Sequence, residues 1–199
     1  MSNNHIVKTR IAIFSSGRGT NTEMLIRAFR EDSSVIICSI ICNDSKAEVL
    51  NVAKKYSVAS QVITYSEFYE KETVTQQLQS LKITHIVLAG FLWVVPKSIV
   101  NRYSKQIVNL HPSLLPKYGG KGMFGKHVHQ AVKSARERKT GITIHLVNEK
   151  YDEGKVLFQI SCDISPTDSV EKIEDKVKNL EHSYYHKIIR IWIDGGFET

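Results

Sequence analysis

Asn109 and His111 stand two residues apart at the end of an apolar run, and Pro112 follows directly. Side chains two apart on a strand project from the same face, so both can reach one cleft. Pro112 disfavours a helical conformation at His111 and keeps the chain extended there. An amide and an imidazole together can stabilise a negatively charged oxygen. The alternative is a histidine that caps a strand beside an asparagine that bonds a loop backbone.

Asp152 and Gly154 lie in "EKYDEGKV", between two strand-like runs. Asp-x-Gly is common in tight turns, so a purely structural role is the alternative. A carboxylate beside a histidine tunes the charge of the histidine and can relay a proton. If Asp152 lies beside His111, we expect it to keep His111 protonated at neutral pH, because an unperturbed histidine has a pKa of about 6.5.

A glycine-rich turn, "SSGRGTN", joins the first strand-like run to the first helix-like one. Such a turn presents bare backbone N–H groups at the positive end of a helix, which is typical of a phosphate site. It departs from the dinucleotide fingerprint, because Thr22 occupies the third glycine position, and no Walker A lysine follows. The alternative is a turn that needs glycine for steric reasons only.

His127 and His129 have the H-x-H spacing of some metal sites. Their surroundings look helical, which places the two side chains about 200° apart around the helix axis. No cysteine or paired carboxylate joins them at ligand spacing, so we expect no metal site. The chain also has no serine or cysteine nucleophile motif.

The elements that must position these residues alternate between strands and helices, which predicts a doubly wound, mostly parallel α/β sheet. After residue 122 a helix and two strands around a short loop predict an antiparallel C-terminal hairpin. The expected strands are Ile11–Phe14, Val35–Cys42, Gln61–Thr64, His85–Gly90, 106–111, Gly141–Val147 and Lys155–Ile164. The expected helices begin at Asn21 and Pro96 or span 45–56, Glu67–Leu81 and 124–135.

A long C-terminal helix completes the pattern, with Asp168 as its expected cap and Gly195-Gly196 as its end. Apolar residues recur along it every three or four positions, which indicates one buried stripe. The stripe consists of Val170, Ile173, Val177, Leu180, Tyr184, Ile188 and Ile191. We find no internal repeat or linker and expect a single domain over residues 1–199.

The composition of the 199-residue chain is that of an ordinary globular protein, with 42% hydrophobic residues and a net charge of +7. The positive charge favours anionic partners, but the basic residues are scattered, so phosphorylated small molecules fit better than nucleic acid. No apolar run is long enough to span a membrane. The opening "MSNNHIVKTR" lacks the apolar region of a signal peptide, and three cysteines suit a reducing compartment, so we expect a cytoplasmic protein.

The segments that contain these candidate residues, in this order and at these distances along the chain, resemble those of the folate-dependent formyltransferases. The Asn-x-His-Pro-Ser-x-Leu-Pro core is specific for that superfamily, and the Gly-Thr-Asn turn resembles its glycinamide ribonucleotide branch. The resemblance covers nearly the whole chain. It is carried by "SSGRGTN", "VLAGFLWVV" (87–95), "NLHPSLLPKYGGKG" (109–122), "GITIHLV" (141–147), "YDEGKVLFQ" (151–159) and "LEHSYYHKII" (180–189).

The resemblance implies that 10-formyltetrahydrofolate donates a formyl group to the amine of 5-phosphoribosylglycinamide in purine biosynthesis. The N-terminal half would bind phosphate and the C-terminal half folate, in a monomer or homodimer. By this resemblance, Asn109, His111 and Asp152 are catalytic; Gly19, Thr20 and Asn21 bind the phosphate and Glu181 the ribose; and Leu92, Trp93, Val94, Val95, Asn109, Asn148 and Asp152 contact the folate. Two departures are Trp93, where relatives often have arginine, and the loop 120–129.

Four other functions share parts of this pattern. Methionyl-tRNA formyltransferase carries a further C-terminal domain, and formyltetrahydrofolate deformylase typically adds an N-terminal one. Formylation of an amino sugar nucleotide is a third alternative. The fourth is a binding protein of the same architecture without catalysis, against which the Asn109, His111 and Asp152 group argues.

Overall fold

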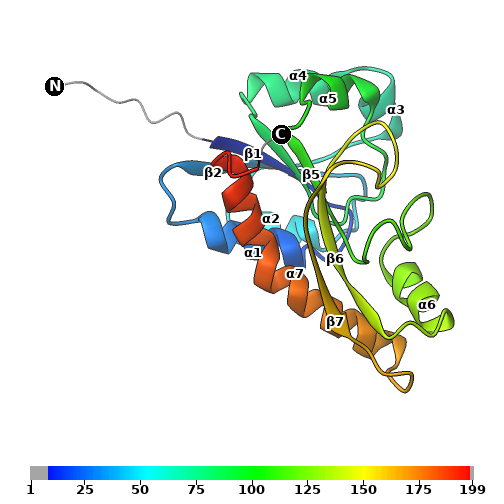
Figure 1. Cartoon of the computed structure of the whole chain (residues 1–199). Helices are drawn as coiled ribbons and strands as arrows, with labels where there is room; N and C mark the ends of the chain where they lie inside the picture. The colour runs from blue at the N-terminus through cyan, green and yellow to red at the C-terminus, as the bar shows by residue number, and fades with distance from the viewer. Residues whose placement is uncertain (1–8, 198–199) are drawn as a thin grey trace.

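The computed structural model describes residues 9–197, so most of the segment assessed for a signal peptide lies outside the described residues. Seven strands form one sheet in the order β3-β2-β1-β4-β5-β6-β7 (Figure 1). Neighbouring strands from β3 to β5 are parallel, whereas β5, β6 and β7 pair antiparallel. The strands are β1 (Thr9–Phe14), β2 (Val35–Cys42), β3 (Ser60–Val62), β4 (His85–Leu88), β5 (Ile107–His111), β6 (Lys139–Leu146) and β7 (Val156–Asp163).

Helices cover both faces of this sheet, as the alternating pattern predicts (Figure 1). On one face α1, α2 and α7 pack over β1, β2 and β6, and on the other α3, α4 and α5 pack over β1, β4 and β5. α6 packs on the first part of α7. The helices are α1 (Thr20–Phe29), α2 (Val49–Lys55), α3 (Tyr65–Tyr69), α4 (Thr73–Ser80), α5 (Lys97–Arg102), α6 (Lys126–Ser134) and α7 (Val170–Ile193).

The sheet has a topological switch point between β1 and β4. From β1 the chain proceeds outward to β2 and β3, and then returns to β4 and continues the other way to β5. The segments after β1 and β4 therefore diverge and leave a crevice at the carboxyl ends of these strands, where ligands of open α/β sheets bind. The turn after Phe14 and the segment after Leu88 face this crevice, and both belong to the segments that carry the predicted chemistry.

The expected helix over Glu67–Leu81 is wrong in one respect, because the chain forms two short helices there. Thr64 and Glu67 form a capping box that begins α3. Phe68 and Val74 are both buried, yet a spacing of six residues would place them about 240° apart on one helix. The chain breaks at Glu72, which has a φ of 49°, and this break lets both side chains enter the core.

The long C-terminal helix is confirmed, but its cap and its stripe differ from expectation. Ser169, not Asp168, is the N-cap, and its hydroxyl accepts a hydrogen bond from the backbone N–H of Lys172 at 3.1 Å. The expected stripe averages 3.5 residues per repeat and therefore drifts by about 20° per heptad around a straight helix. Near the end of α7 the buried positions are Tyr185, Ile188, Ile189 and Trp192, while Ile191 is 43% exposed.

Candidate active site

A cavity of about 670 Å³ opens at the carboxyl ends of β1, β4 and β5, a size that suits a small-molecule site. All of the predicted site residues lie on its lining, although they come from five separate stretches of sequence. These residues are Gly19, Thr20, Asn21, Leu92, Trp93, Val94, Val95, Asn109, His111, Asn148, Asp152 and Glu181. The sheet topology thus brings the three sequence motifs into one place.

The glycine-rich turn lies at one end of the cavity and leads into α1, which begins at Thr20 rather than at the expected Asn21. Gly19 has a φ of 76°, and a Cβ atom there would lie 2.8 Å from the Cα of Val49. Glycine is therefore required both by the left-handed backbone and by the close approach of α2. The first N–H groups of α1 have no partner within the helix and point out of its N-terminus, where an anion is stabilised.

Asn21 connects this turn to α7. Its side-chain amide donates a hydrogen bond of 2.7 Å to Glu181, a contact across 160 residues of sequence. Burial raises the pKa of Glu181, while the bond from Asn21 and the charge of Lys178 oppose the rise. Arg18, whose side chain is 59% exposed, pairs with Glu174 at 2.5 Å on the same side of the cavity. This end of the cavity therefore offers cations, a helix N-terminus and a carboxylate that can accept bonds from hydroxyl groups.

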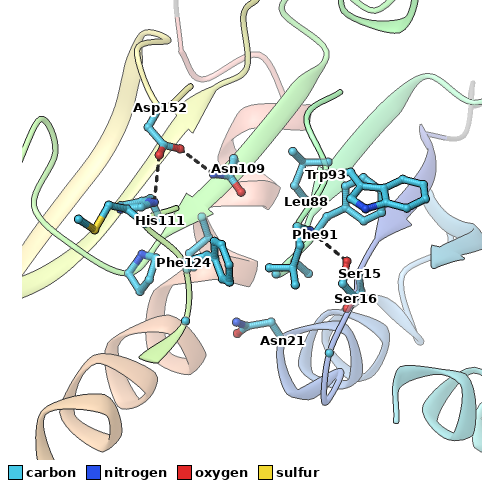
Figure 2. A pocket seen from close by; sticks show the side chains of 18 of the residues that line it. Ser15, Ser16, Asn21, Leu88, Phe91, Trp93, Asn109, His111, Phe124 and Asp152 are labelled. Carbon is cyan, nitrogen blue, oxygen red and sulfur yellow. Dashed lines mark hydrogen bonds and ion pairs between the residues drawn. The ribbon is translucent and has the colours of Figure 1, made fainter. Parts of the chain in front are cut away.

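Asn109, His111 and Asp152 converge at the other end of the cavity (Figure 2). Asp152 lies 3.5 Å from the Nδ1 atom of His111 and 3.5 Å from the amide nitrogen of Asn109. His145, which pairs with Asn109 across β5 and β6, completes the group. Its Nε2 atom lies 3.2 Å from the Asn109 amide nitrogen and 3.5 Å from Asp152. One carboxylate thus faces two imidazoles and one amide.

Backbone carbonyls orient both imidazole rings. His145 Nδ1 lies 2.8 Å from the carbonyl oxygen of Leu146 and donates to it, which turns Nε2 toward Asn109 and Asp152. His111 Nε2 lies 2.8 Å from the carbonyl oxygen of Tyr118 and donates to it. The Nδ1 atom of His111 is then the position at which a proton can be gained or lost, and it faces Asp152.

The protonation state of His111 differs from our expectation. Burial lowers the pKa of His111, and the charge of Asp152 counters this effect only in part. At neutral pH the ring is therefore neutral in the free protein. Burial alone would raise the pKa of Asp152, but the bond to His145, the proximity of His111 and the Gly120 N–H together lower it, so the carboxylate is charged. The sequence indicated the neighbour of His111 but not the depth at which the ring is buried.

Two glycines hold the carboxylate in place. The backbone N–H of Gly120 donates a 2.8 Å hydrogen bond to Asp152, which ties the loop after β5 to the loop between β6 and β7. A Cβ atom on Gly154 would collide with the carbonyl oxygen of Leu146, so this position closes the hairpin only as glycine. Asp152 itself has a φ of 53°, a conformation that aspartate and asparagine adopt more readily than most residues.

The segment after β4 forms an apolar wall of the cavity. The N–H of Leu92 donates to the hydroxyl of Ser16 at 3.0 Å, and the Tyr69 hydroxyl donates to the Val94 carbonyl at 2.8 Å. These two bonds fix the wall at both ends. Trp93 contributes its ring to an aromatic cluster, with centroids of Tyr65, Phe68 and Tyr69 each 5.9 Å away. In Figure 2, Trp93 lies on the opposite side of the cavity from Asp152.

Some of the residues that line this cavity were not predicted from the sequence. His145 could have been found, because an antiparallel pairing of β5 and β6 places it directly opposite Asn109. For His129 the H-x-H spacing indicated only a metal ligand as a possible role. Arg18 lies within the glycine-rich turn but had no expected role of its own. Glu174 and Lys178 belong to no motif, and only the fold brings them, on α7, to this turn. Among residues 9–197, no cluster of three or more histidine, cysteine, aspartate or glutamate side chains could hold a metal ion.

Comparison with known proteins agrees with this geometry. A model of the formyl transferase family matches residues 9–189. The chain is 32% identical to phosphoribosylglycinamide formyltransferase of Haemophilus influenzae, over 94% of this chain and 88% of that protein. It is 28% identical to the protein of the same name from Bacillus subtilis, over 91% of this chain and 93% of that protein. The crystal structure of phosphoribosylglycinamide formyltransferase from Brucella melitensis superimposes with a TM-score of 0.82 at 30% identity, covering 96% of this chain and 98% of that one.

Proposed function

This chain belongs to the formyl transferase family, and from that premise we propose that it is a phosphoribosylglycinamide formyltransferase of purine biosynthesis. It transfers the formyl group of 10-formyltetrahydrofolate to the amine of 5-phosphoribosylglycinamide, giving formylglycinamide ribonucleotide and tetrahydrofolate. The names of its relatives support the acceptor. The observation that carries the proposal is the meeting of Asn109, His111 and Asp152 in a cavity that also contains the glycine-rich turn.

The two substrates enter from opposite ends of the cavity. The phosphate of the acceptor binds the backbone of Gly19, Thr20 and Asn21, and Glu181 accepts bonds from the ribose hydroxyls. The helix N-terminus and the position of Glu181 on the cavity lining beside Asn21 support these roles. The folate lies against the apolar wall, with Asn109 and the loop from Asn148 to Asp152 around it. The folate-binding residues are Leu92, Trp93, Val94, Val95, Asn109, Asn148 and Asp152.

The reaction needs an oxyanion site and a path for one proton. The acceptor nitrogen attacks the formyl carbon, the carbonyl oxygen becomes an oxyanion, and the bond from that carbon to N10 of the folate then breaks. Asn109 donates an N–H to the oxyanion. Its bond toward Asp152 is long at 3.5 Å, so this N–H is the one available to the substrate.

His111 and Asp152 handle the proton. His111 begins neutral, and its Nδ1 takes a proton from the acceptor nitrogen, which becomes positively charged as its bond to the formyl carbon forms. The resulting imidazolium is stabilised by the Asp152 carboxylate, 3.5 Å away, and by the developing oxyanion. The proton then passes to N10 as the folate leaves. Direct attack by the amine requires no nucleophilic side chain, and binding of both substrates aligns the reacting atoms.

10-Formyltetrahydrofolate is a co-substrate rather than a resident cofactor, and none of the steps uses a metal ion. The partners are small molecules, and the protein acts as one domain over residues 1–199, as a monomer or homodimer in the cytoplasm. None of the helices described between residues 9 and 197 is both long and apolar enough to cross a membrane.

An absorbance assay tests the proposal. The protein is mixed with 10-formyltetrahydrofolate, or a deaza analogue, in the presence and absence of phosphoribosylglycinamide. We expect the folate to lose its formyl group only when the acceptor is present. Loss without the acceptor would instead establish a deformylase, and no loss in either mixture would indicate another acceptor or a binding protein.

A further inference from the structure

An ion pair spans the phosphate end of the cavity. Arg18 lies in the glycine-rich turn, Glu174 lies on α7, and both side chains line the cavity. Nη2 of Arg18 donates a hydrogen bond of 2.5 Å to Oε1 of Glu174, across 156 residues of sequence. Neither residue has a part in the chemistry described above. The pair joins the turn that is proposed to bind the phosphate to the helix that carries Glu181.

Two carboxyl groups, those of Glu174 and Glu181, lie beside the proposed phosphate site. Glu181 accepts a hydrogen bond of 2.7 Å from the side chain of Asn21, at the end of the turn. Burial is the main cause of the raised pKa of Glu181. The charge of Glu174 adds to this effect and the charge of Arg18 opposes it, so the three groups are neighbours. Backbone N–H groups carry no net charge, so a phosphate dianion on them needs a cation nearby to offset the repulsion from these carboxyl groups.

Arg18 can supply that positive charge. It directly precedes Gly19, the first residue whose N–H group is proposed to hold the phosphate, and its long side chain can reach the outer oxygens of the bound group. The bond to Glu174 uses one guanidinium nitrogen, and the planar fork offers further N–H donors in an arrangement that suits phosphate. The two side chains are 59% and 27% exposed, and a pair this accessible contributes little to stability, so a change of partner costs little.

We infer that Arg18 is a ligand of the acceptor's phosphate and that Glu174 competes with the phosphate for it. When the acceptor binds, the guanidinium turns from a carboxylate, which carries one negative charge, to a phosphate dianion, which carries two. When the site is empty, Glu174 holds the guanidinium beside the turn. The exchange makes the site selective for acceptors that carry a phosphate. This inference rests on the phosphate site of the proposed function.

The test uses two variants with opposite expected effects. Calorimetry with ribose 5-phosphate should show about tenfold weaker binding by Arg18→Gln, which loses the charge-assisted bonds to the phosphate. Binding by Glu174→Gln should be about threefold tighter, because a neutral amide no longer competes for the guanidinium. In the double variant the effect of Glu174→Gln should largely disappear, since the group for which Glu174 competes is gone.

Catalysis provides a second readout. In the formyl transfer assay, Arg18→Gln should raise the KM for phosphoribosylglycinamide about tenfold, with kcat within about threefold of that of the unmodified protein. With ribosylglycinamide, which lacks the phosphate, kcat/KM should be the same for both proteins. Arg18→Lys, which keeps the charge but not the planar fork, should recover part of the lost affinity. A purely structural role of Arg18 in the turn would affect both acceptors alike.

Glu171→Gln is the matched control. Glu171 lies about one turn before Glu174 on α7, pairs with Lys126 at 2.7 Å and lies outside the cavity lining. We expect the control to bind ribose 5-phosphate as the unmodified protein does. All of these variants should keep the thermal midpoint of the unmodified protein within about 2 °C, because accessible ion pairs contribute little to stability.

The inference is overturned if Arg18→Gln binds ribose 5-phosphate as tightly as the unmodified protein does. Equal weakening by Arg18→Gln and Glu174→Gln would overturn it as well, since that pattern means that the ion pair only holds the turn in place. If the unmodified protein binds ribose 5-phosphate but formylates no acceptor, the proposed function fails while the variants still decide the role of Arg18. If the unmodified protein does not bind ribose 5-phosphate, the phosphate site and this inference fail together.

Discussion

Replacing Asp152 by asparagine removes one negative charge and little else. Asparagine tolerates the left-handed backbone of this position, where φ is 53°. Its side-chain oxygen can still accept the hydrogen bond from the Gly120 N–H, which is 2.8 Å long in the original protein. We therefore expect the fold and the loop conformation to be unchanged. The substitution should affect only the proton transfer in which His111 takes part.

The magnitude follows from the geometry around His111. The carboxylate lies 3.5 Å from Nδ1, the atom that gains the proton in the proposed mechanism. Two opposite charges about 4 Å apart at an effective dielectric constant of about 20 attract by about 4 kcal/mol. The Asp152 side chain is 13% exposed, so solvent reduces this value, and we expect a loss of roughly 2–4 kcal/mol. The turnover number should fall by about 30- to 900-fold.

The assay measures kcat for formyl transfer at saturating substrates. The KM for phosphoribosylglycinamide and the thermal midpoint are measured for the same variants. Asp163→Asn is the matched control, because Asp163 lies on β7 and its side chain is 86% exposed. We expect the control to have ordinary activity, and Asp152→Asn to have unchanged KM and thermal midpoint. Turnover by Asp152→Asn at the original rate would refute the assignment of Asp152 to proton transfer.

Three more predictions follow from the site and its burial. His111→Ala should reduce kcat by about 10²–10³-fold while calorimetry shows ribose 5-phosphate binding unchanged; unchanged turnover would rule out its oxyanion role. Gly19→Ala should weaken ribose 5-phosphate binding at least tenfold and destabilise the protein by about 1–3 kcal/mol, because a Cβ atom would lie 2.8 Å from the Val49 Cα at a left-handed position; tight binding would contradict the phosphate assignment. Burial lowers the pKa of His85, His111 and His129 below 6.5, so the unfolded chain binds more protons than the folded one between those lowered values and 6.5. The free energy of unfolding in urea should therefore fall as the pH drops from 7 toward 5, and a flat or rising profile would contradict the neutral histidines.

The sequence was most informative where a local pattern has one structural solution. Apolar runs such as Val35–Cys42 are typical of strands covered on both faces, and their alternation with helices predicts the mostly parallel sheet that the structure contains. The Asn109 and His111 pair was predictable for the same reason, because strand parity and Pro112 fix both side chains on one face. The fold class and the position of the proposed catalytic group at a strand end followed from these rules.

Features that depend on tertiary packing were not predictable in this way. The drift of the α7 stripe from Tyr184 to Tyr185 depends on how the helix lies across the sheet, where the Tyr185 hydroxyl donates to the Leu88 carbonyl at 2.7 Å. His145 joins the site only through the register of β5 and β6. The neutral state of His111 depends on burial that a list of neighbours does not reveal. Each of these features reflects contacts between residues far apart in the chain.

The fate of the formyl group is the most direct test of the central claim. The donor is prepared with an isotope-labelled formyl carbon and incubated with the protein and phosphoribosylglycinamide, and the products are separated and analysed by mass spectrometry. If the protein is the proposed transferase, the label appears on the glycinamide nitrogen of the acceptor, in an amount equal to the tetrahydrofolate formed. Label recovered as free formate, or retained on the folate after long incubation, would contradict this function.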